Sequence, residues 1–223
     1  MSQIAGLLLE VYRRLLRAYG PQGWWPAETP FEVMVGAVLT QATAWRNVER
    51  AIARLKAADS LSPEAISRLP QVRLEELVRP AGFFRQKARR LKALVDLILS
   101  HGGAEGLLAL PPEELRERLL SVPGIGPETA DSILLYAAGH PVFVVDAYTK
   151  RILHRLGLLA EEAVPYGEVQ RTFQENLPSD PELYGEYHAL LVRHAKEHCR
   201  TRPHCDGCPL ADLCRVHEVG LPS

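Results

Sequence analysis

Four cysteines near the end of the chain are the residues whose spacing most clearly indicates chemistry. Cys199, Cys205, Cys208 and Cys214 follow the pattern C-x5-C-x2-C-x5-C and are all the cysteines in 223 residues. Four thiolates spaced this closely can surround one metal centre. The spacing suits zinc and iron–sulfur ligation alike. We therefore expect a metal-binding loop at 199–214.

A glycine-rich turn in mid-chain could bind phosphate. Residues 120–130 read LSVPGIGPETA, between two segments of helical pattern. Gly124 and Gly126 allow a tight turn and the close approach of a partner, and Pro127 suits the first turn of a helix. The N–H groups at that helix start can hold a phosphate without any lysine. The same pattern also forms ordinary corners between helices.

Asp146 is a candidate acid because it follows the apolar run 142–145 and precedes a helical segment. Its simplest role is to cap that helix. A helix N-terminus also favours the ionised form of a carboxylate. An ionised carboxylate at a reacting centre can stabilise a developing positive charge or activate water. Capping and catalysis are therefore compatible.

The three tryptophans all lie early in the chain, with Trp24 and Trp25 in a Gly-Trp-Trp-Pro loop and Trp45 further on. Tryptophan usually packs in a core. Two adjacent tryptophans in a Pro-flanked loop cannot both point the same way into one core. Stacking of a flat ligand on their rings is the alternative use.

The elements that must position these residues are helices. Apolar residues recur with helical period, and Pro or Gly separates the segments. One helix is expected to open at Thr29-Pro30-Phe31-Glu32, where Thr29 can cap, Pro30 suits the first turn and Glu32 completes a capping box. Its body, 34–40, is apolar all round, which predicts a helix in the middle of a core. Only 142–145 looks extended, and one such run cannot form a sheet. The sequence therefore predicts an all-α fold. Helical patterns cover 4–19, 30–40, 45–57, 63–69, 73–79, 84–100, 112–120, 127–138, 147–156, 166–176 and 182–198.

Composition and charge indicate a compact globular protein with 47% hydrophobic and 24% charged residues. The net charge is −1, so any grip on nucleic acid must be local rather than global. Each candidate basic residue also suits a solvated helix face. These candidates are Arg85, Lys87, Arg89, Arg90 and Lys92 in one segment, and Lys196, Arg200, Arg202 and Arg215 near the cysteines.

The cellular setting is expected to be the cytoplasm. The first twenty residues lack the features of a signal peptide, and no stretch approaches the ~18 apolar residues of a membrane span. A reducing compartment favours metal ligation by the cysteines over disulfides.

Taken together, the hairpin Val122-Pro-Gly-Ile-Gly126 and Asp146 closely resemble helix-hairpin-helix DNA glycosylases related to endonuclease III. The resemblance extends from Thr29 to the last cysteine. It implies two lobes: a helical barrel at 28–140 that carries the hairpin, and a lobe formed by 1–27 and 141–223. It also implies a monomer that acts on double-stranded DNA in the bacterial or archaeal nucleoid, with Asp146 as the catalytic carboxylate. The DNA contacts it implies are Gly124, Ile125, Gly126, Thr129, Lys150, Arg200 and Arg202.

Glu128 departs from the bifunctional members of that superfamily, which have a lysine two positions after the second hairpin glycine. That amine forms a Schiff base with the sugar. A carboxylate cannot form an imine, so we expect hydrolytic base removal with weak or absent lyase activity. Glu128 is equally suited to a helix N-terminus, and Lys150 and Lys196 remain substitute amines.

A glutamate here, between Gly-Ile-Gly and Thr-Ala-Asp-Ser-Ile, resembles the 3-methyladenine DNA glycosylase III branch. That branch implies removal of an alkylated purine such as 3-methyladenine, whose positive charge stacks well on aromatic rings. Trp24, Trp25 and Trp45 would form the pocket walls. Gln41 would fill the gap left by the flipped base, and Lys196 would lie at the pocket.

Endonuclease III relatives hold a [4Fe–4S] cluster with the pattern C-x6-C-x2-C-x5-C, so the first loop here is one residue shorter. The resemblance implies a cluster that supports structure and positions DNA.

Three other functions fit parts of the sequence. A bifunctional endonuclease III-type glycosylase and lyase acting on oxidised pyrimidines keeps the fold, but needs an amine other than residue 128. A non-catalytic DNA-binding module would use only the hairpin and the cysteine loop. A zinc-stabilised helical protein without a DNA role would use the cysteines alone.

Overall fold

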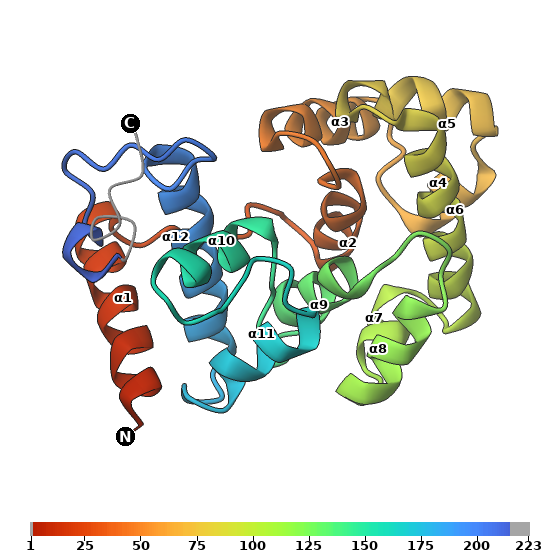
Figure 1. The fold of residues 1–223 in the computed structure, drawn as a ribbon. Coiled ribbons are helices and arrows are strands. Elements are labelled where there is room, and N and C mark those ends of the chain that lie inside the picture. The colour runs from red at the N-terminus through yellow and green to blue at the C-terminus, as the bar shows by residue number, and fades with distance from the viewer. Residues whose placement is uncertain (1, 215–223) are drawn as a thin grey trace. The chain divides into compact units, whose positions relative to one another are not determined.

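The chain folds into helices, and the computed structural model describes residues 2–214 (Figure 1). Arg215, one of the basic candidates, lies outside this range. The chain divides into two compact units: Met1–Trp24 with Pro141–Ser223, and Trp25–His140. Within the described residues no strand is assigned, and no helix is both long and apolar enough to cross a membrane. The all-α prediction is confirmed.

The mid-chain unit is built around the apolar helix α2. Its helices are α2 (Pro30–Leu39), α3 (Trp45–Ala57), α4 (Pro63–Arg68), α5 (Gln71–Val78), α6 (Phe84–Ser100), α7 (Ala104–Leu108), α8 (Pro112–Leu120) and α9 (Pro127–Tyr136), with a short 3-10 turn at Arg79–Ala81. Every residue of α2 after Pro30 is buried, and α2 packs against α3, α6 and α9. This central position is the one its all-apolar surface requires. Helix α7 has no counterpart among the predicted helical patterns.

The start of α2 shows why the helix begins there. The Thr29 hydroxyl accepts a hydrogen bond from the Glu32 N–H at 3.1 Å, and Pro30 occupies the first turn. The Glu32 carboxylate accepts from the N–H of Glu28 and pairs with Lys56 at 3.0 Å. Side chains therefore satisfy N–H groups at this end that the helix itself leaves unpaired.

The unit formed by the two ends of the chain contains α1 (Gln3–Tyr19), α10 (Ala147–Arg155), α11 (Tyr166–Gln174) and α12 (Pro181–Glu197), with a 3-10 turn at Ala211–Leu213. Helix α1, red in Figure 1, packs against the blue α12, and α12 also packs against α10. The buried Tyr187 hydroxyl donates to the Leu8 carbonyl at 2.8 Å and links α12 to α1. Helix α12 is therefore the common support of α1 and α10.

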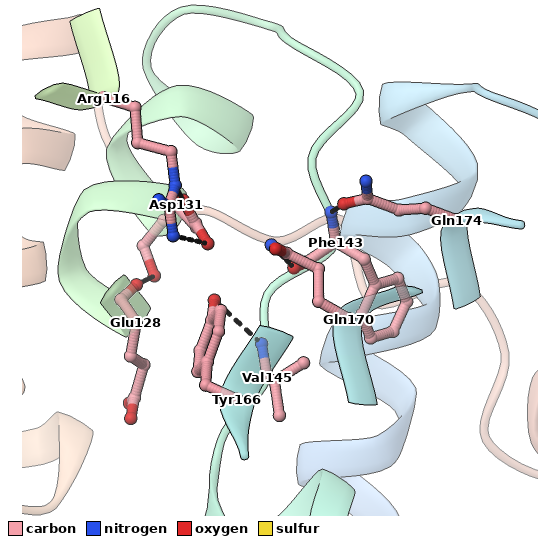
Figure 2. A network of polar contacts seen from close by, with 9 residues as sticks. Arg116, Glu128, Asp131, Phe143, Val145, Tyr166, Gln170 and Gln174 are labelled. Carbon is pink, nitrogen blue, oxygen red and sulfur yellow. Dashed lines mark hydrogen bonds and ion pairs between the residues drawn. The ribbon is translucent and has the colours of Figure 1, made fainter. Parts of the chain in front are cut away.

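The extended run before Asp146 is held by side chains of α11 instead of by a sheet (Figure 2). The Phe143 N–H donates to Gln174 at 3.0 Å, and the Phe143 carbonyl accepts from Gln170 at 2.8 Å. The Val145 N–H donates to the Tyr166 hydroxyl at 3.3 Å. Because these bonds satisfy buried backbone groups, the run can lead into α10 without a partner strand.

Candidate active site and nucleic-acid interface

The hairpin turn, residues 121–126, joins α8 to α9. Ile125 is buried and its N–H donates to the Val122 carbonyl at 3.0 Å, which closes the turn. Gly124 has φ +86°, a left-handed conformation that favours glycine, whereas Gly126 is extended and precedes Pro127. Both glycines are exposed. The turn therefore presents its backbone and the N-terminus of α9 to solvent, as an anion site requires.

Gln41 lies in the turn after α2 and bonds directly to the hairpin. Its Nε2 donates to the Gly124 carbonyl at 3.1 Å and to the Thr129 hydroxyl at 2.9 Å, and its Oε1 accepts from Arg90. The structure thus brings together three residues that the resemblance had assigned to DNA and one, Arg90, that had been considered only as a basic surface residue.

Lys87 fixes the end of α2 from which Gln41 projects. It was expected on a basic surface, and that expectation is wrong, because its ammonium is buried and donates to the carbonyls of Leu39 and Ala81 at 2.9 and 2.6 Å. Burial, aided by the nearby charge of Arg90, lowers the pKa of Lys87 to about 8. Lys87 therefore satisfies carbonyls at a helix end, where a cation is favoured.

Glu128 stands in the first turn of α9, with an exposed side chain. Its backbone carbonyl accepts from the Ser132 hydroxyl at 2.7 Å. In the same helix, the buried Asp131 pairs with Arg116 of α8 at 2.7 Å, which fastens α8 to α9 below the hairpin turn (Figure 2). The carboxylate of Glu128 is therefore presented on the exposed end of a well-anchored helix.

Trp25 and Trp45 meet within the mid-chain unit. Their ring centroids lie 5.2 Å apart at 88°, and Tyr136 of α9 packs 5.2 Å from Trp25. All three are partly exposed. Trp25 also lies on Gly36, where an added Cβ would be 3.1 Å from the indole. Trp24 belongs to the other unit. Tyr136 was missed in the sequence because nothing in a helical pattern distinguishes it from a core residue.

Asp146 caps α10 and lies almost wholly inside its unit. Its Oδ1 accepts from the Thr149 N–H at 2.7 Å and from the Thr149 hydroxyl at 2.8 Å, and its Oδ2 lies 3.6 Å from His188 Nε2 of α12. Burial by itself would raise the pKa of Asp146, but the contact with His188 and the two bonds from Thr149 outweigh it, and the pKa falls below its ordinary value. Asp146 is therefore ionised at neutral pH.

Three further basic candidates lie in the mid-chain unit: Arg85 and Arg89 are exposed, whereas Lys92 donates to the carbonyls of Ser67 and Leu69 at 2.8 and 2.6 Å.

The other basic candidates that the structure describes lie in the unit formed by the chain ends and fall into two groups. The Lys150 ammonium donates to the Val164 carbonyl at 2.7 Å. Lys196, near the end of α12, is exposed, as are Arg200 and Arg202 in the cysteine loop. Lys150 is therefore engaged in holding a loop, whereas the other three project from the surface.

All four cysteines line one cavity, together with His194, Arg155 and apolar side chains such as Ile152 and Leu210. No disulfide joins them. Arg155 organises the loop: it donates to Cys199 Sγ at 3.2 Å and to the carbonyls of Arg200 and Thr201 at 2.7 and 3.0 Å. Across residues 2–214, no three His, Cys, Asp or Glu side chains converge as ligands of a single ion.

Among residues 2–214 every assigned element is a helix, and the Gly-x-Gly turn between α8 and α9 makes a helix-hairpin-helix that is followed by the helix-capping Asp146. A family model described as "HhH-GPD superfamily base excision DNA repair protein" matches residues 35–179. The chain belongs to this superfamily and is a DNA glycosylase, hence an enzyme.

Relatives and solved structures agree with this membership. The chain is 49% identical to a candidate DNA repair glycosylase of Methanocaldococcus jannaschii, over 93% of this chain and 96% of that protein. It is 30% identical to the thymine-DNA glycosylase of Aeropyrum pernix, over 94% and 95%.

The structure of H. pylori 3-methyladenine DNA glycosylase, determined with an ethenoadenine bound, matches with a TM-score of 0.74 and 32% identity, over 88% of this chain and 98% of that one. An endonuclease III bound to DNA matches in fold with a TM-score of 0.82 and 24% identity, over 98% and 99%.

Proposed function

We propose that the protein is a monofunctional glycosylase that hydrolyses the N-glycosidic bond of a flipped alkylated purine in double-stranded DNA. The observation that carries this proposal is the ionised, helix-capping Asp146 beside His188. Such a carboxylate can stabilise the positive charge that develops on the sugar, or activate the attacking water. In this assignment Asp146 is the catalytic carboxylate.

Glu128 supports hydrolysis without strand cleavage. The position that carries a Schiff-base lysine in bifunctional members carries a carboxylate here, and the Lys150 ammonium is held by a carbonyl. We assign Glu128 a role at the reacting base or water. Lys196 remains the amine to examine if strand cleavage is found.

The aromatic cluster of Trp25, Trp45 and Tyr136 supports a pocket for a flat, electron-poor base. The proposal keeps Trp24 as a further wall and Gln41 as the residue that fills the gap in the duplex. Gly124, Ile125, Gly126 and Thr129 would hold one phosphate, and Lys150, Arg200 and Arg202 would contact the backbone elsewhere.

Product analysis with four duplexes tests this function. Purified protein is incubated with DNA carrying methylated purine, oxidised pyrimidine, a thymine–guanine mismatch or no lesion, and each product is split into untreated and alkali-treated halves. Release of methylpurine with strand cleavage only after alkali supports the proposal. Cleavage of oxidised-pyrimidine DNA before alkali would instead establish an endonuclease III-type glycosylase and lyase. Mismatched thymine release would identify a pyrimidine mismatch enzyme.

We propose further that the cysteine loop holds a [4Fe–4S] cluster. Endonuclease III-like relatives typically carry one, whereas the 3-methyladenine glycosylase III branch lacks it. The residue types suit such a cluster, because all four cysteines line one cavity and Arg155 donates to Cys199 Sγ, the kind of hydrogen bond that cluster ligands receive. Bound there, the cluster would support the loop that carries Arg200 and Arg202.

Metal analysis of the protein purified without oxygen tests this assignment. We expect about four iron and four sulfide per chain with broad visible absorbance, lost in Cys208→Ala and retained in the loop control His204→Ala. One zinc per chain without iron would contradict the cluster.

A further inference from the structure

The side-chain amide of Gln41 has a defined orientation. Its Nε2 donates to Gly124 and Thr129, so both amide hydrogens are in use, and its Oε1 accepts from Arg90. A guanidinium can only donate and a carbonyl can only accept. The amide is therefore oriented from both sides, with Arg90 on one and the hairpin turn on the other.

Arg90 also lies directly against the hairpin turn. A Cβ added at Gly124 would be 2.2 Å from Arg90 Nε and 2.8 Å from its Cδ. Arg90 comes from α6, Gln41 from the turn after α2, and Gly124 from the turn between α8 and α9. One half-buried guanidinium thus joins three segments that are distant in sequence.

We propose that Arg90 is a positioning residue that keeps the side chain of Gln41 in a fixed place relative to the hairpin turn. When the turn binds the DNA backbone, Gln41 is then already placed to fill the gap in the duplex. The inference rests on the proposed function, which assigns Gln41 to the gap beside the base opposite the lesion. An arginine suits the task because its rigid planar fork contacts Gly124 along one edge while donating to the amide. Lysine has no such fork.

A fluorescence measurement on the full chain tests this role. The duplex carries a stable abasic analogue opposite 2-aminopurine, whose fluorescence reports whether a side chain fills the gap beside it. At saturating protein we expect the fluorescence of the 2-aminopurine to change at the same rate with the wild type and with the exposed α3 variant Arg50→Met. With Arg90→Met and Arg90→Lys the rate should be about fivefold to tenfold lower, which is a typical coupling between residues in contact. Circular dichroism checks that each variant is folded.

The double variant that combines Arg90→Met with Gln41→Ala shows whether Arg90 affects gap filling through Gln41. If Arg90 acts through Gln41, then Arg90→Met has no further effect on gap filling once Gln41 is removed. An equal effect in both backgrounds, or a weaker salt dependence of binding with unchanged gap filling, would show that Arg90 is only a phosphate contact and overturn the inference. So would a wild type that gives no fluorescence change. Because the abasic analogue needs no excision, failure of the proposed glycosylase reaction would be seen separately, in the base-release assay.

Discussion

Asp146 experiences two opposing influences on its charge. Burial disfavours the carboxylate, while Thr149 and His188 favour it, and the balance lies on the ionised side. A group whose pKa is lowered by folding stabilises the folded state at neutral pH, and this contribution is lost as the pH falls through that lowered pKa. The charge that catalysis would use therefore also contributes to stability.

Asp146→Asn should abolish most base release while leaving DNA binding intact. An amide still caps α10, but it cannot stabilise a developing cation, so kcat should fall by at least about 100-fold. Single-turnover excision and a separate binding titration measure the two effects. Asp180→Asn makes the same change at the exposed cap of α12 and should leave the rate unchanged. Equal rates in wild type and Asp146→Asn would remove Asp146 from the mechanism.

His188→Gln should move the acidic limb of the pH–rate profile to higher pH. Without His188, burial acts on Asp146 with less opposition, so the pKa of Asp146 rises and the carboxylate protonates earlier as the pH falls. The profile of excision rate against pH measures the midpoint. His101→Gln, in the other unit, serves as control. An unmoved midpoint in His188→Gln would show that this contact does not tune the catalytic acid.

At the scale of elements, the hairpin turn depends on two glycines for different reasons. Gly124 has a positive φ, and an added Cβ there would be 2.2 Å from Arg90 Nε, whereas Gly126 is extended and an added Cβ there would meet nothing within 4 Å. At Gly124 the fold itself requires glycine, whereas at Gly126 the fold would accept a side chain and only contact with DNA could require an exposed backbone.

Gly124→Ala should lower the free energy of unfolding by about 1–3 kcal/mol, because it combines a left-handed alanine with displacement of the Arg90 side chain. Gly126→Ala should change it by less than about 1 kcal/mol. Denaturant unfolding of both variants makes the comparison. Similar losses at the two positions would mean that neither φ nor the contact with Arg90 governs the turn.

For the whole molecule, a net charge of −1 leaves DNA binding to local groups. The groups we propose for this role are Arg200 and Arg202, which are exposed on the loop whose backbone carbonyls accept from Arg155. A loop ordered in this way can present positive charge to a phosphate even though the protein as a whole is not basic.

Replacing Arg200 or Arg202 by alanine should weaken binding to all DNA sequences and reduce the slope of log K against log salt by about one per lost contact. Titrations at several salt concentrations measure the slope. Arg13→Ala, exposed on α1, should leave it unchanged. If the two loop variants keep the wild-type slope, the loop does not touch the phosphates.

The sequence by itself determined most of the helices and two of their caps, since these depend on local pattern. The apolar surface of 34–40 predicted a central helix, Thr29 and Asp146 predicted helix caps, and the short spacing of the cysteines predicted that they lie together, as they do along one cavity. These features depend on the period of the hydrophobic residues, on the unpaired N–H groups at a helix start and on short loops, each of which lies within about twenty residues of sequence.

Only the tertiary structure decided which side chains meet across long separations. Tyr136 packs on Trp25, His188 lies beside Asp146, and Gln41 bonds to both Arg90 and Gly124. Lys87 is a further example, because its sequence context suggests an exposed cation, but the structure buries its ammonium against two carbonyls. Such contacts arise from the packing of helices distant in the chain, and no local propensity encodes which face of one helix will receive a residue from another.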